Sequence, residues 1–382
     1  MIKKIYFIIC VLLTGSLLNS GEAYFKTDIS AQSAIVIEKS TGRVLYSKDS
    51  EAHLPMASTT KIMTAICAIE NGNLEDNVPI SAKAAATEGS SMYLQEGEKM
   101  SLRELLYGLM LSSGNDAAVA IAEYFGGNDA FVEMMNKKAK EIGAVDTNFA
   151  NPNGLPDDSH YSTAHDMARI TAYGLKNPEF AQIVATKTYK VQGEGKACPR
   201  QLTNHNKLLN TCNGCIGVKT GFTKAAGRCL ISACERDGMT LICVTLNASD
   251  DWRDHCNLYD DLFSEYKMKK IIEKGQQIKE INVENSETGK ILALADKDIH
   301  YPLTAGEKTE TMINSVDNLS APVSKGEMCG ELVLFLNNSE IGRIELVADR
   351  DAEKISAVKV VTELLKRNID EIYRKWLTFM GN

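Results

Sequence analysis

Residues 31–45 carry the alternation of apolar and polar positions that is typical of strands. The alternation is interrupted at Ser40-Thr41-Gly42, where short polar residues and a glycine indicate a turn. Arg43-Val44-Leu45-Tyr46 then continues as a second strand pattern. The segment therefore predicts a β-hairpin near the start of the chain.

Apolar residues at intervals of three and four predict helices in the next stretch. The pattern is clearest between Ser101 and Ser112, where leucines share one side and Ser101 with Glu104 gives the capping-box spacing. The same periodicity predicts helices over residues 63–69, 116–125, 130–142 and 162–174, and short apolar runs predict buried strands over 229–233 and 240–246. Strands at both ends with helices between them predict one sheet built from distant segments and packed by a helical cluster.

The composition changes after about Tyr266, where a basic stretch is followed by repeated strand patterns. These patterns predict a small all-β domain, and because it holds no cluster of potential catalytic groups we expect it to act as a spacer or docking domain. The strand-like runs cover residues 279–283, 291–294, 332–336 and 342–347.

The last segment carries an apolar stripe at helical spacing with basic residues beside it, which is typical of a helix that lies flat on an anionic membrane. Packing of this helix on its own β domain or on a second copy is the alternative. The stripe consists of Val358, Val361, Leu365, Ile369, Ile372, Trp376 and Phe379, and the basic flanks are Lys359, Lys366, Arg367, Arg374 and Lys375.

The N-terminus has the pattern of a secretory signal. Lys3 and Lys4 precede an apolar run over residues 5–13, and Gly21-Glu22-Ala23 offers small residues at a cleavage site. We expect residues 1–23 to be a signal peptide, with an uncleaved anchor as the alternative. The 382-residue length fits two domains, and the net charge of −8 argues against a nucleic-acid partner.

The chain has ten cysteines, and nine remain once Cys10 is removed with the predicted signal. An odd number leaves at least one thiol unpaired or intermolecular. Cys212-Asn213-Gly214-Cys215 is a single CxxC, and a structural zinc would need two further ligands that no second CxxC supplies. We therefore favour free thiols or one local disulfide, and we expect no metal and no cofactor.

Three short motifs supply a set of groups suited to acyl transfer through a serine ester. A serine beside a helix N-terminus has backbone N–H groups available for a developing anion, and a lysine three residues later lies over the same helix face. We predict that Ser58 is the nucleophile and that Lys61 is its base, once burial near Lys219 has removed the lysine proton. The motifs are Ser58-Thr59-Thr60-Lys61, Ser113-Gly114-Asn115 and Lys219-Thr220-Gly221.

The second motif supplies a proton relay and an amide. We expect Ser113 to pass a proton between Lys61, Ser58 and the leaving amine, and Asn115 to hold Lys61 and donate to a substrate carbonyl. A Ser-Gly-Asn sequence is also a helix stop, and here the stop and the site coincide.

The third motif supplies an anion anchor beside a strand edge. Lys219 and the Thr220 hydroxyl are suited to a substrate carboxylate, and Gly221 lets an extended peptide approach the strand as an added neighbour. We expect the backbone N–H groups of Phe222 and Ser58 to be the oxyanion donors.

With these motifs, the chain resembles the low-molecular-mass penicillin-binding proteins that are serine D-alanyl-D-alanine carboxypeptidases. The resemblance covers nearly the whole chain and rests also on the stretches around the motifs: residues 57–64, 90–94, 113–117 and 161–168. It implies an α/β (α+β) β-lactamase/transpeptidase-like domain over residues 24–267, with a helical cluster on an antiparallel sheet. It further implies a small β-sandwich-like domain over 268–350 and an amphipathic membrane helix over 351–382.

The same resemblance implies a reaction and its partners. It implies removal of the terminal D-alanine from peptidoglycan stem peptides ending in D-Ala-D-Ala, with β-lactam antibiotics as covalent inhibitors. It implies an exported enzyme held peripherally at the outer face of the cytoplasmic membrane. It gives Ser58, Lys61 and Ser113 catalytic roles, makes Asn115 and Lys219 substrate-binding, and matches Arg253 to an arginine that helps bind the substrate carboxylate.

Two positions depart from the family pattern. Phe222 stands where the family often has histidine, so only a backbone role is expected there. His205 aligns with an arginine that often ties down the loop carrying Asp166, and we hypothesise an Asp166–His205 pair that weakens as His205 loses its charge.

Three other functions share parts of this chemistry. A β-lactamase of the class that uses a glutamate for deacylation needs Glu-x-x-x-Asn before Lys219, but the only glutamate between Asn151 and Lys190 is Glu179, with Ile183 four residues on. A D,D-endopeptidase would use the same site on another substrate, and a non-catalytic β-lactam or peptidoglycan sensor would need the groove without deacylation.

Overall fold

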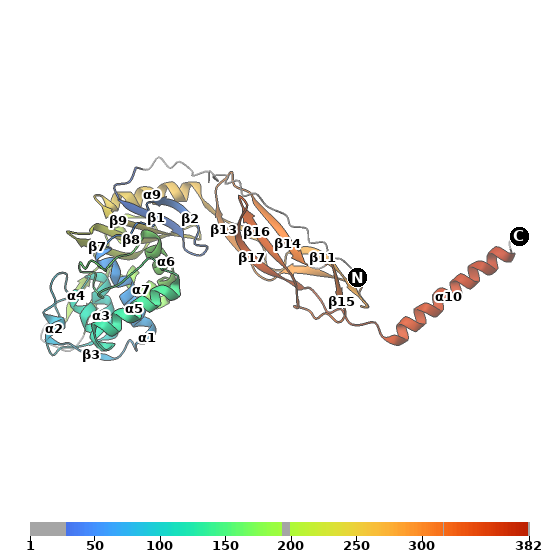
Figure 1. Ribbon diagram of the computed structural model, residues 1–382, viewed down its shortest axis with the longest axis horizontal. Coiled ribbons are helices and arrows are strands. Elements are labelled where there is room, and N and C mark those ends of the chain that lie inside the picture. The colour runs from blue at the N-terminus through green and yellow to red at the C-terminus, as the bar shows by residue number, and fades with distance from the viewer. Residues whose placement is uncertain (1–27, 193–198, 316, 381–382) are drawn as a thin grey trace, which may run out of the picture.

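The computed structural model describes residues 28–192, 199–315 and 317–380. The predicted signal peptide, residues 1–23, lies outside the described residues. The chain forms an N-terminal unit (residues 28–265), an elongated β unit (residues 266–355) and a terminal helix, which follow one another along the longest axis of the molecule (Figure 1).

A five-stranded antiparallel sheet in the order β2-β1-β9-β8-β7 forms the centre of the N-terminal unit. The predicted hairpin is confirmed as β1 and β2, and its turn contains Gly42 at φ 69°. The predicted buried strands fall in β8 and β9. The bounds are β1 (Ser33–Glu38), β2 (Val44–Lys48), β7 (Cys215–Thr223), β8 (Gly227–Arg236) and β9 (Met239–Ala248).

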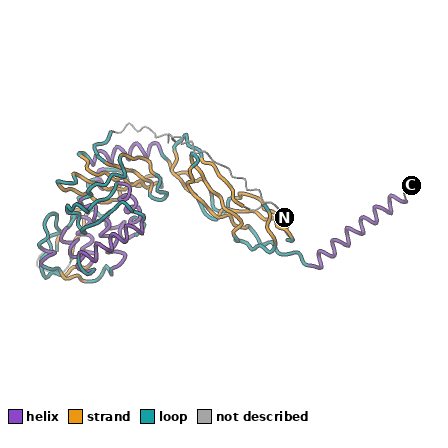
Figure 2. Tube along the Cα trace, in the orientation of Figure 1, coloured by secondary structure: helices purple, strands orange, loops and turns teal. Residues whose placement is uncertain are grey.

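The two faces of this sheet are buried by different helices because side chains alternate along each strand. Ile35 and Val244 pack into the large helical cluster, whereas Val36 and Cys243 pack against α9 (Asp251–Glu265) on the opposite face (Figures 1 and 2). The larger helices of the cluster are α1 (Lys61–Asn71), α3 (Leu102–Leu111), α4 (Asn115–Tyr124), α5 (Asn128–Ile142), α6 (Ala164–Gly174) and α7 (Pro178–Ala185).

Short elements complete this unit. They are the 3₁₀ turn η1 (Ala57–Thr60), α2 (Ala82–Ala85), α8 (Leu208–Thr211), and the two small ladders β3 (Asn77–Pro79) with β4 (Lys99–Ser101) and β5 (Thr188–Val191) with β6 (Arg200–Thr203).

Local sequence signals fix the ends of several helices. The capping box predicted for α3 is present: the Ser101 side chain accepts from the backbone N–H of Glu104, and the Glu104 carboxylate accepts from the backbone N–H of Ser101. The other four predicted helices are confirmed as α1, α4, α5 and α6, with ends that differ by a few residues.

The β unit contains a six-stranded sheet in the order β14-β16-β17-β12-β11-β15 and a two-stranded ladder of β10 with β13. Ile281, Leu334 and Ile344 lie in its apolar core, and the four predicted strand runs all fall within its strands. The bounds are β10 (Lys267–Ile272), β11 (Gln277–Glu284), β12 (Lys290–Ala295), β13 (Ile299–Leu303), β14 (Thr309–Ser315), β15 (Asn318–Ser320), β16 (Met328–Leu336) and β17 (Ser339–Ala348).

Arg43, in the β1–β2 turn, joins the two units. Its guanidinium donates to the Pro302 carbonyl and to the Glu307 carboxylate in the β unit. It also lies over the rings of Tyr266 and Tyr301, 5.1 and 5.3 Å from their centroids. One side chain therefore contacts both sides of the junction.

The terminal helix α10 (Ala357–Met380) extends away from the β unit (Figures 1 and 2). Val358, Ile369 and Trp376 of the predicted apolar stripe are all more than half exposed, while the side chain of Phe379 lies outside the described residues. No helix in the described part of the chain is long and apolar enough to cross a membrane.

Candidate active site

Ser58 lies in η1, the 3₁₀ turn between β2 and α1. The turn begins at Ala57, which has the left-handed φ of 48°, and continues directly into α1 at Lys61. The side chains of Thr59 and Thr60 donate to the carbonyls of Met56 and Ala57, at 2.7 and 2.8 Å. Ser58 is thus held within a tight, hydrogen-bonded turn at the beginning of a helix, close to the predicted position.

Lys61 is fully buried and its amine has three acceptors. The Nζ atom lies 2.9 Å from Ser58 Oγ, 2.7 Å from Asn115 Oδ1 and 2.7 Å from the backbone oxygen of Asn153. The first and second motifs are therefore joined through one nitrogen. These contacts aim the amine at the Ser58 hydroxyl, as a general base requires.

Two buried lysines set the electrostatics of the site. Burial lowers the pKa of Lys61 well below its ordinary value, and the charge of Lys219 lowers it further, while Asp116 acts in the opposite direction. Burial also lowers the pKa of Lys219 to about 7, and its Nζ donates to the Thr220 carbonyl at 2.7 Å. A neutral amine is therefore favoured beside Ser58.

Ser113 and Asn115 come from the junction of α3 and α4. Ser113 is buried and has a left-handed φ of 57°, so the helix stop and the site coincide as predicted. Asn115 begins α4, accepts from Lys61, and donates from Nδ2 to the Glu88 carbonyl at 2.7 Å. The second motif therefore links the base to the loop at residues 88–94.

Asp116 orders that loop. Its carboxylate accepts from Ser91 Oγ at 2.6 Å and from the backbone N–H groups of Met92 and Leu94. Because Asp116 is fully buried, these bonds supply the partners that a buried carboxylate needs. The acid next to Asn115 thus has a supporting role that the sequence analysis did not assign.

Gly221 brings β7 against the serine turn. A Cβ atom at this position would lie 3.0 Å from the backbone nitrogen of Ser58 and 3.2 Å from the Met56 carbonyl oxygen. The lack of a side chain therefore permits the contact between the edge strand and η1. This places the third motif beside the nucleophile.

Three residues of the predicted site, Thr220, Phe222 and Arg253, are more exposed than Ser113, Asn115 and the two lysines. Thr220 is half-buried on β7, and Phe222 is 66% exposed and pairs in register with Arg228 of β8. Arg253 lies in the first turn of α9, where its exposed side chain pairs with Asp250 at 3.2 Å. Among the described contacts none joins Arg253 to the three motifs, so its role in binding a substrate carboxylate stays a prediction.

The hypothesised Asp166–His205 pair is wrong. Asp166 instead accepts from the backbone N–H of Asp146 at 2.8 Å and from Thr147 Oγ1 at 2.9 Å, and it pairs with Arg169. An arginine one helical turn away in α6 therefore satisfies this carboxylate. Burial and the charge of Lys219 lower the pKa of His205, which disfavours the charged histidine that the hypothesised pair requires.

Asn153 and Gly154 contribute to the site but were missed from the sequence. The carbonyl of Asn153 accepts from Lys61, and a Cβ at Gly154 would lie 2.0 Å from the Ala57 carbonyl oxygen. His160 supports the same turn, since its Nε2 lies 2.7 Å from Thr60 Oγ1 and its Nδ1 accepts from the Ala150 N–H. Only the repeated asparagine and glycine residues of 151–154 hinted at a tight loop.

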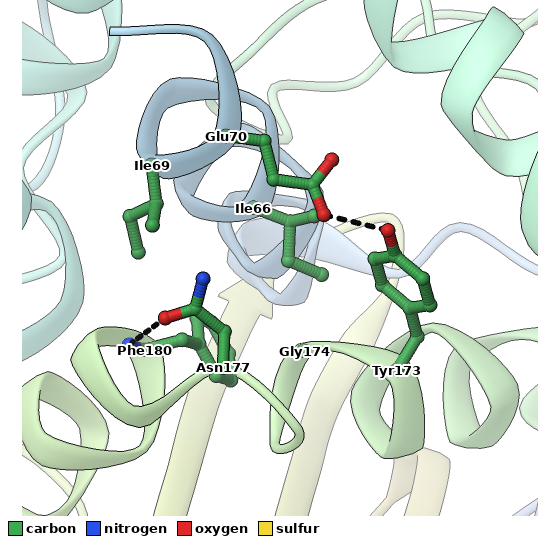
Figure 3. Close-up of a pocket in the computed structure, with 7 residues that line it drawn as sticks. All are labelled: Ile66, Ile69, Glu70, Tyr173, Gly174, Asn177 and Phe180. Atoms are coloured by element: carbon green, nitrogen blue, oxygen red, sulfur yellow. Dashed lines mark hydrogen bonds between the residues drawn. The ribbon is translucent and has the colours of Figure 1, made fainter. Parts of the chain in front are cut away.

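A small pocket between α1, α6 and α7 lies apart from the three motifs. Figure 3 shows Glu70 bonded to Tyr173 at 2.6 Å beside Ile66 and Phe180. None of its lining residues belongs to the three motifs, so it belongs to the packing of the helices.

Known proteins share both the sequence motifs and this arrangement. The sequence pattern of the D-alanyl-D-alanine carboxypeptidases matches residues 20–250, and that of the penicillin-binding protein 5 C-terminal domain matches residues 266–354. The chain belongs to the D-alanyl-D-alanine carboxypeptidase family. It is a low-molecular-mass penicillin-binding protein of the serine type, as its motifs predicted.

Individual relatives agree with this assignment. The D-alanyl-D-alanine carboxypeptidase DacF of Bacillus subtilis is 35% identical over 337 residues, which is 85% of this chain and 86% of that protein. The crystal structure of penicillin-binding protein 5 from Haemophilus influenzae is 29% identical, has a TM-score of 0.73, and matches 86% of this chain and 99% of its own. The α+β catalytic domain with a separate all-β domain is therefore confirmed.

The comparisons and contacts give less support to the endopeptidase and β-lactamase alternatives. A D-alanyl-D-alanine endopeptidase of Pseudomonas aeruginosa is 33% identical but matches only 53% of the chain. Glu179 pairs with Arg103 at 2.6 Å on α7, so the described contacts do not aim it at Ser58 as a β-lactamase would need.

Proposed function

We propose that this protein removes the terminal D-alanine from peptidoglycan stem peptides that end in D-Ala-D-Ala, which limits their cross-linking. The observation that carries the proposal is the 2.9 Å contact between Lys61 Nζ and Ser58 Oγ, with Lys219 buried nearby. Membership of the carboxypeptidase family supports this substrate class.

The first half of the reaction is the formation of an ester. Neutral Lys61 takes the Ser58 proton while Ser58 Oγ attacks the carbonyl between the two D-alanines, and the backbone N–H groups of Ser58 and Phe222 receive the developing negative charge. Protonated Lys219, with Thr220 and Arg253, holds the terminal carboxylate. Ser113 carries the proton to the leaving D-alanine.

The second half is hydrolysis. A water molecule attacks the ester carbon, gives its proton to Lys61, and releases the shortened peptide as Ser58 recovers its proton. A β-lactam follows the first half only: its ring nitrogen is the leaving group but stays attached to the acyl group. It therefore remains on Ser58 as a covalent inhibitor.

The test is release of D-alanine from a diacyl-Lys-D-Ala-D-Ala tripeptide, measured beside Ser58→Ala. We expect release that disappears in the variant, together with a penicillin adduct on Ser58 in the wild type. A folded protein that forms the adduct but releases no D-alanine from the tripeptide would contradict the carboxypeptidase proposal and favour the endopeptidase or sensor.

We further propose that the protein is exported and that α10 lies on the outer face of the cytoplasmic membrane. The support is the exposed apolar stripe of α10 and the basic residues on its flanks. Deletion of residues 355–382 should release the protein from anionic vesicles while tripeptide hydrolysis is kept. Equal vesicle binding by both forms would contradict attachment through this helix.

A further inference from the structure

Four thiols lie close together at the N-terminal end of β7, the strand that carries the third motif. Cys212 is the C-cap of α8, Cys215 begins β7, Cys234 lies in β8, and Cys256 lies on α9. Cys215 and Cys234 face each other in the antiparallel register of the two strands. Residues from four elements therefore meet at one place, and the mechanism proposed above uses none of them.

The sulfur atoms form a chain of contacts. Cys212 Sγ lies 3.6 Å from Cys234 Sγ. The thiols of Cys256 and Cys215 lie close enough to Cys212 and Cys234, respectively, to shift the pKa values of those two groups. A disulfide needs the two sulfurs about 2 Å apart, so the closest pair must approach by about 1.5 Å, which rotation of both side chains can supply.

Cys212 has the surroundings of a reactive thiol. Hydrogen bonds from Cys234 and Cys256, and the charge of Arg236, lower its pKa to about 6. The Arg236 Nη2 lies 3.8 Å from Cys212 Sγ, and Arg236 is itself held by Asp260 at 2.9 Å. Cys212 is half-buried, so a small oxidant can reach it, whereas Cys234 is fully buried and is reached only through its neighbours.

A bound metal ion is the other use of clustered cysteines. No group of three or more cysteine, histidine or acidic side chains within the described ranges is arranged to hold one. The contacts run as a chain of pairs, with the Cys215 thiol also donating to the Gly217 carbonyl at 3.3 Å. This arrangement favours pairing of thiols.

We propose that Cys212 and Cys234 form a reversible disulfide that links the N-terminal end of β7 to β8. The thiolate of Cys212 attacks one sulfur of an external disulfide, forms a mixed disulfide and releases one thiolate. Cys234 then attacks Cys212 Sγ and passes its proton to the departing thiolate, which forms the internal bond and releases the second half of the external disulfide as a thiol. Two protein thiols are oxidised and one external disulfide is reduced to two thiols.

The bond would close a ring that contains Lys219, Thr220 and Gly221. β7 is an edge strand, bonded in the five-stranded sheet to β8 alone. Its position against η1 sets the contact between Gly221 and the Ser58 amide. A covalent link between Cys212, three residues before β7, and the neighbouring strand β8 would therefore restrict fraying of the strand that forms one wall of the site. Export, as proposed above, would expose the chain to disulfide oxidants.

The test uses the purified protein equilibrated with oxidised or reduced glutathione, then alkylated and mapped by mass spectrometry. We expect one linked peptide pair joining Cys212 to Cys234 in the oxidised sample, and a fall in Tm of about 5–10 °C on reduction. Cys212→Ser should abolish the redox-dependent difference in Tm. Cys329→Ser, a buried cysteine of the β unit, is the matched control and should keep it.

Three results would overturn the proposal. The first is full alkylation of Cys212 and Cys234 after oxidation with no difference in Tm. The second is a linked peptide that joins Cys234 to Cys215 instead. The third is a stoichiometric metal ion, found by elemental analysis of the untreated protein and lost when the thiols are modified.

Discussion

Burial of Lys219 disfavours its charged form and makes the free energy of unfolding depend on pH. Its folded pKa of about 7 is far below the ordinary 10.5, so the native protein gives up this proton before the unfolded chain does. Between pH 7 and 10 the unfolded state binds more protons, and the free energy of unfolding therefore rises with pH across this window.

Replacing Lys219 with methionine should remove that dependence. We expect the free energy of unfolding to increase by about 2–4 kcal/mol at pH 6, and by less than about 1 kcal/mol at pH 10. Denaturant titrations at the two pH values measure the difference, with the exposed Lys99→Met as control. A gain that is the same at both pH values would show that packing and not charge is responsible. Activity should fall, because the carboxylate anchor is gone.

Gly221 can be tested by adding one carbon atom. In Gly221→Ala the new Cβ would press on the Ser58 backbone nitrogen at 3.0 Å, so the edge strand or the serine turn must shift. We expect kcat/KM for the tripeptide to fall by about 10²-fold, because small displacements of reacting groups have effects of this size. Gly306→Ala, where nothing lies within 4 Å, should leave it unchanged. An unaffected Gly221→Ala enzyme would mean that the contact is not needed.

At the scale of elements, the capping box of α3 is a sequence signal whose effect is confined to the first turn of one helix. Ser101 accepts from the backbone N–H of Glu104, and loss of this cap leaves an unpaired donor at the start of a buried helix. Ser101→Ala should lower the free energy of unfolding by about 1 kcal/mol, measured by thermal or chemical denaturation. The exposed Ser320→Ala in β15 should change it by much less, and equal effects would argue that the cap contributes nothing.

The comparison of α3 with the loop at 151–154 explains what the sequence could predict. Capping, periodicity and turn residues act within a few positions, so helices α1 and α3 to α6, the hairpin and the three motifs were recognisable from the chain alone, whereas α7 was not predicted. The Asn153 carbonyl reaches Lys61 from 92 positions away and through a main-chain atom, so no side-chain pattern marks it. The Asp166–His205 hypothesis failed for a different reason. Arg169, one helical turn away, pairs with Asp166, and a family resemblance alone does not reveal such a local partner.

At the scale of the whole molecule, Arg43 holds the two units together. Its ion pair with Glu307 is largely buried, with side-chain exposures of 13% and 19%. A double-mutant cycle of Arg43→Ala and Glu307→Ala, followed by calorimetry, should give a coupling free energy of about 1–2 kcal/mol. The more exposed pair of Arg343 and Glu331 inside the β unit should give a smaller coupling free energy, because solvent screens it. Equal coupling in the two pairs would show that the junction gains nothing from its burial.

The main-chain partners of the site have a consequence for drug escape. Lys61 is held in part by a backbone carbonyl, and Gly221 meets the serine turn through bare backbone. Substitution cannot delete a backbone carbonyl, and adding a side chain at Gly221 presses on the backbone of the nucleophile. We therefore expect tolerated substitutions near the site at exposed positions such as Phe222 rather than at these backbone contacts. Inhibitors that contact only the inner backbone would leave the fewest routes to resistance.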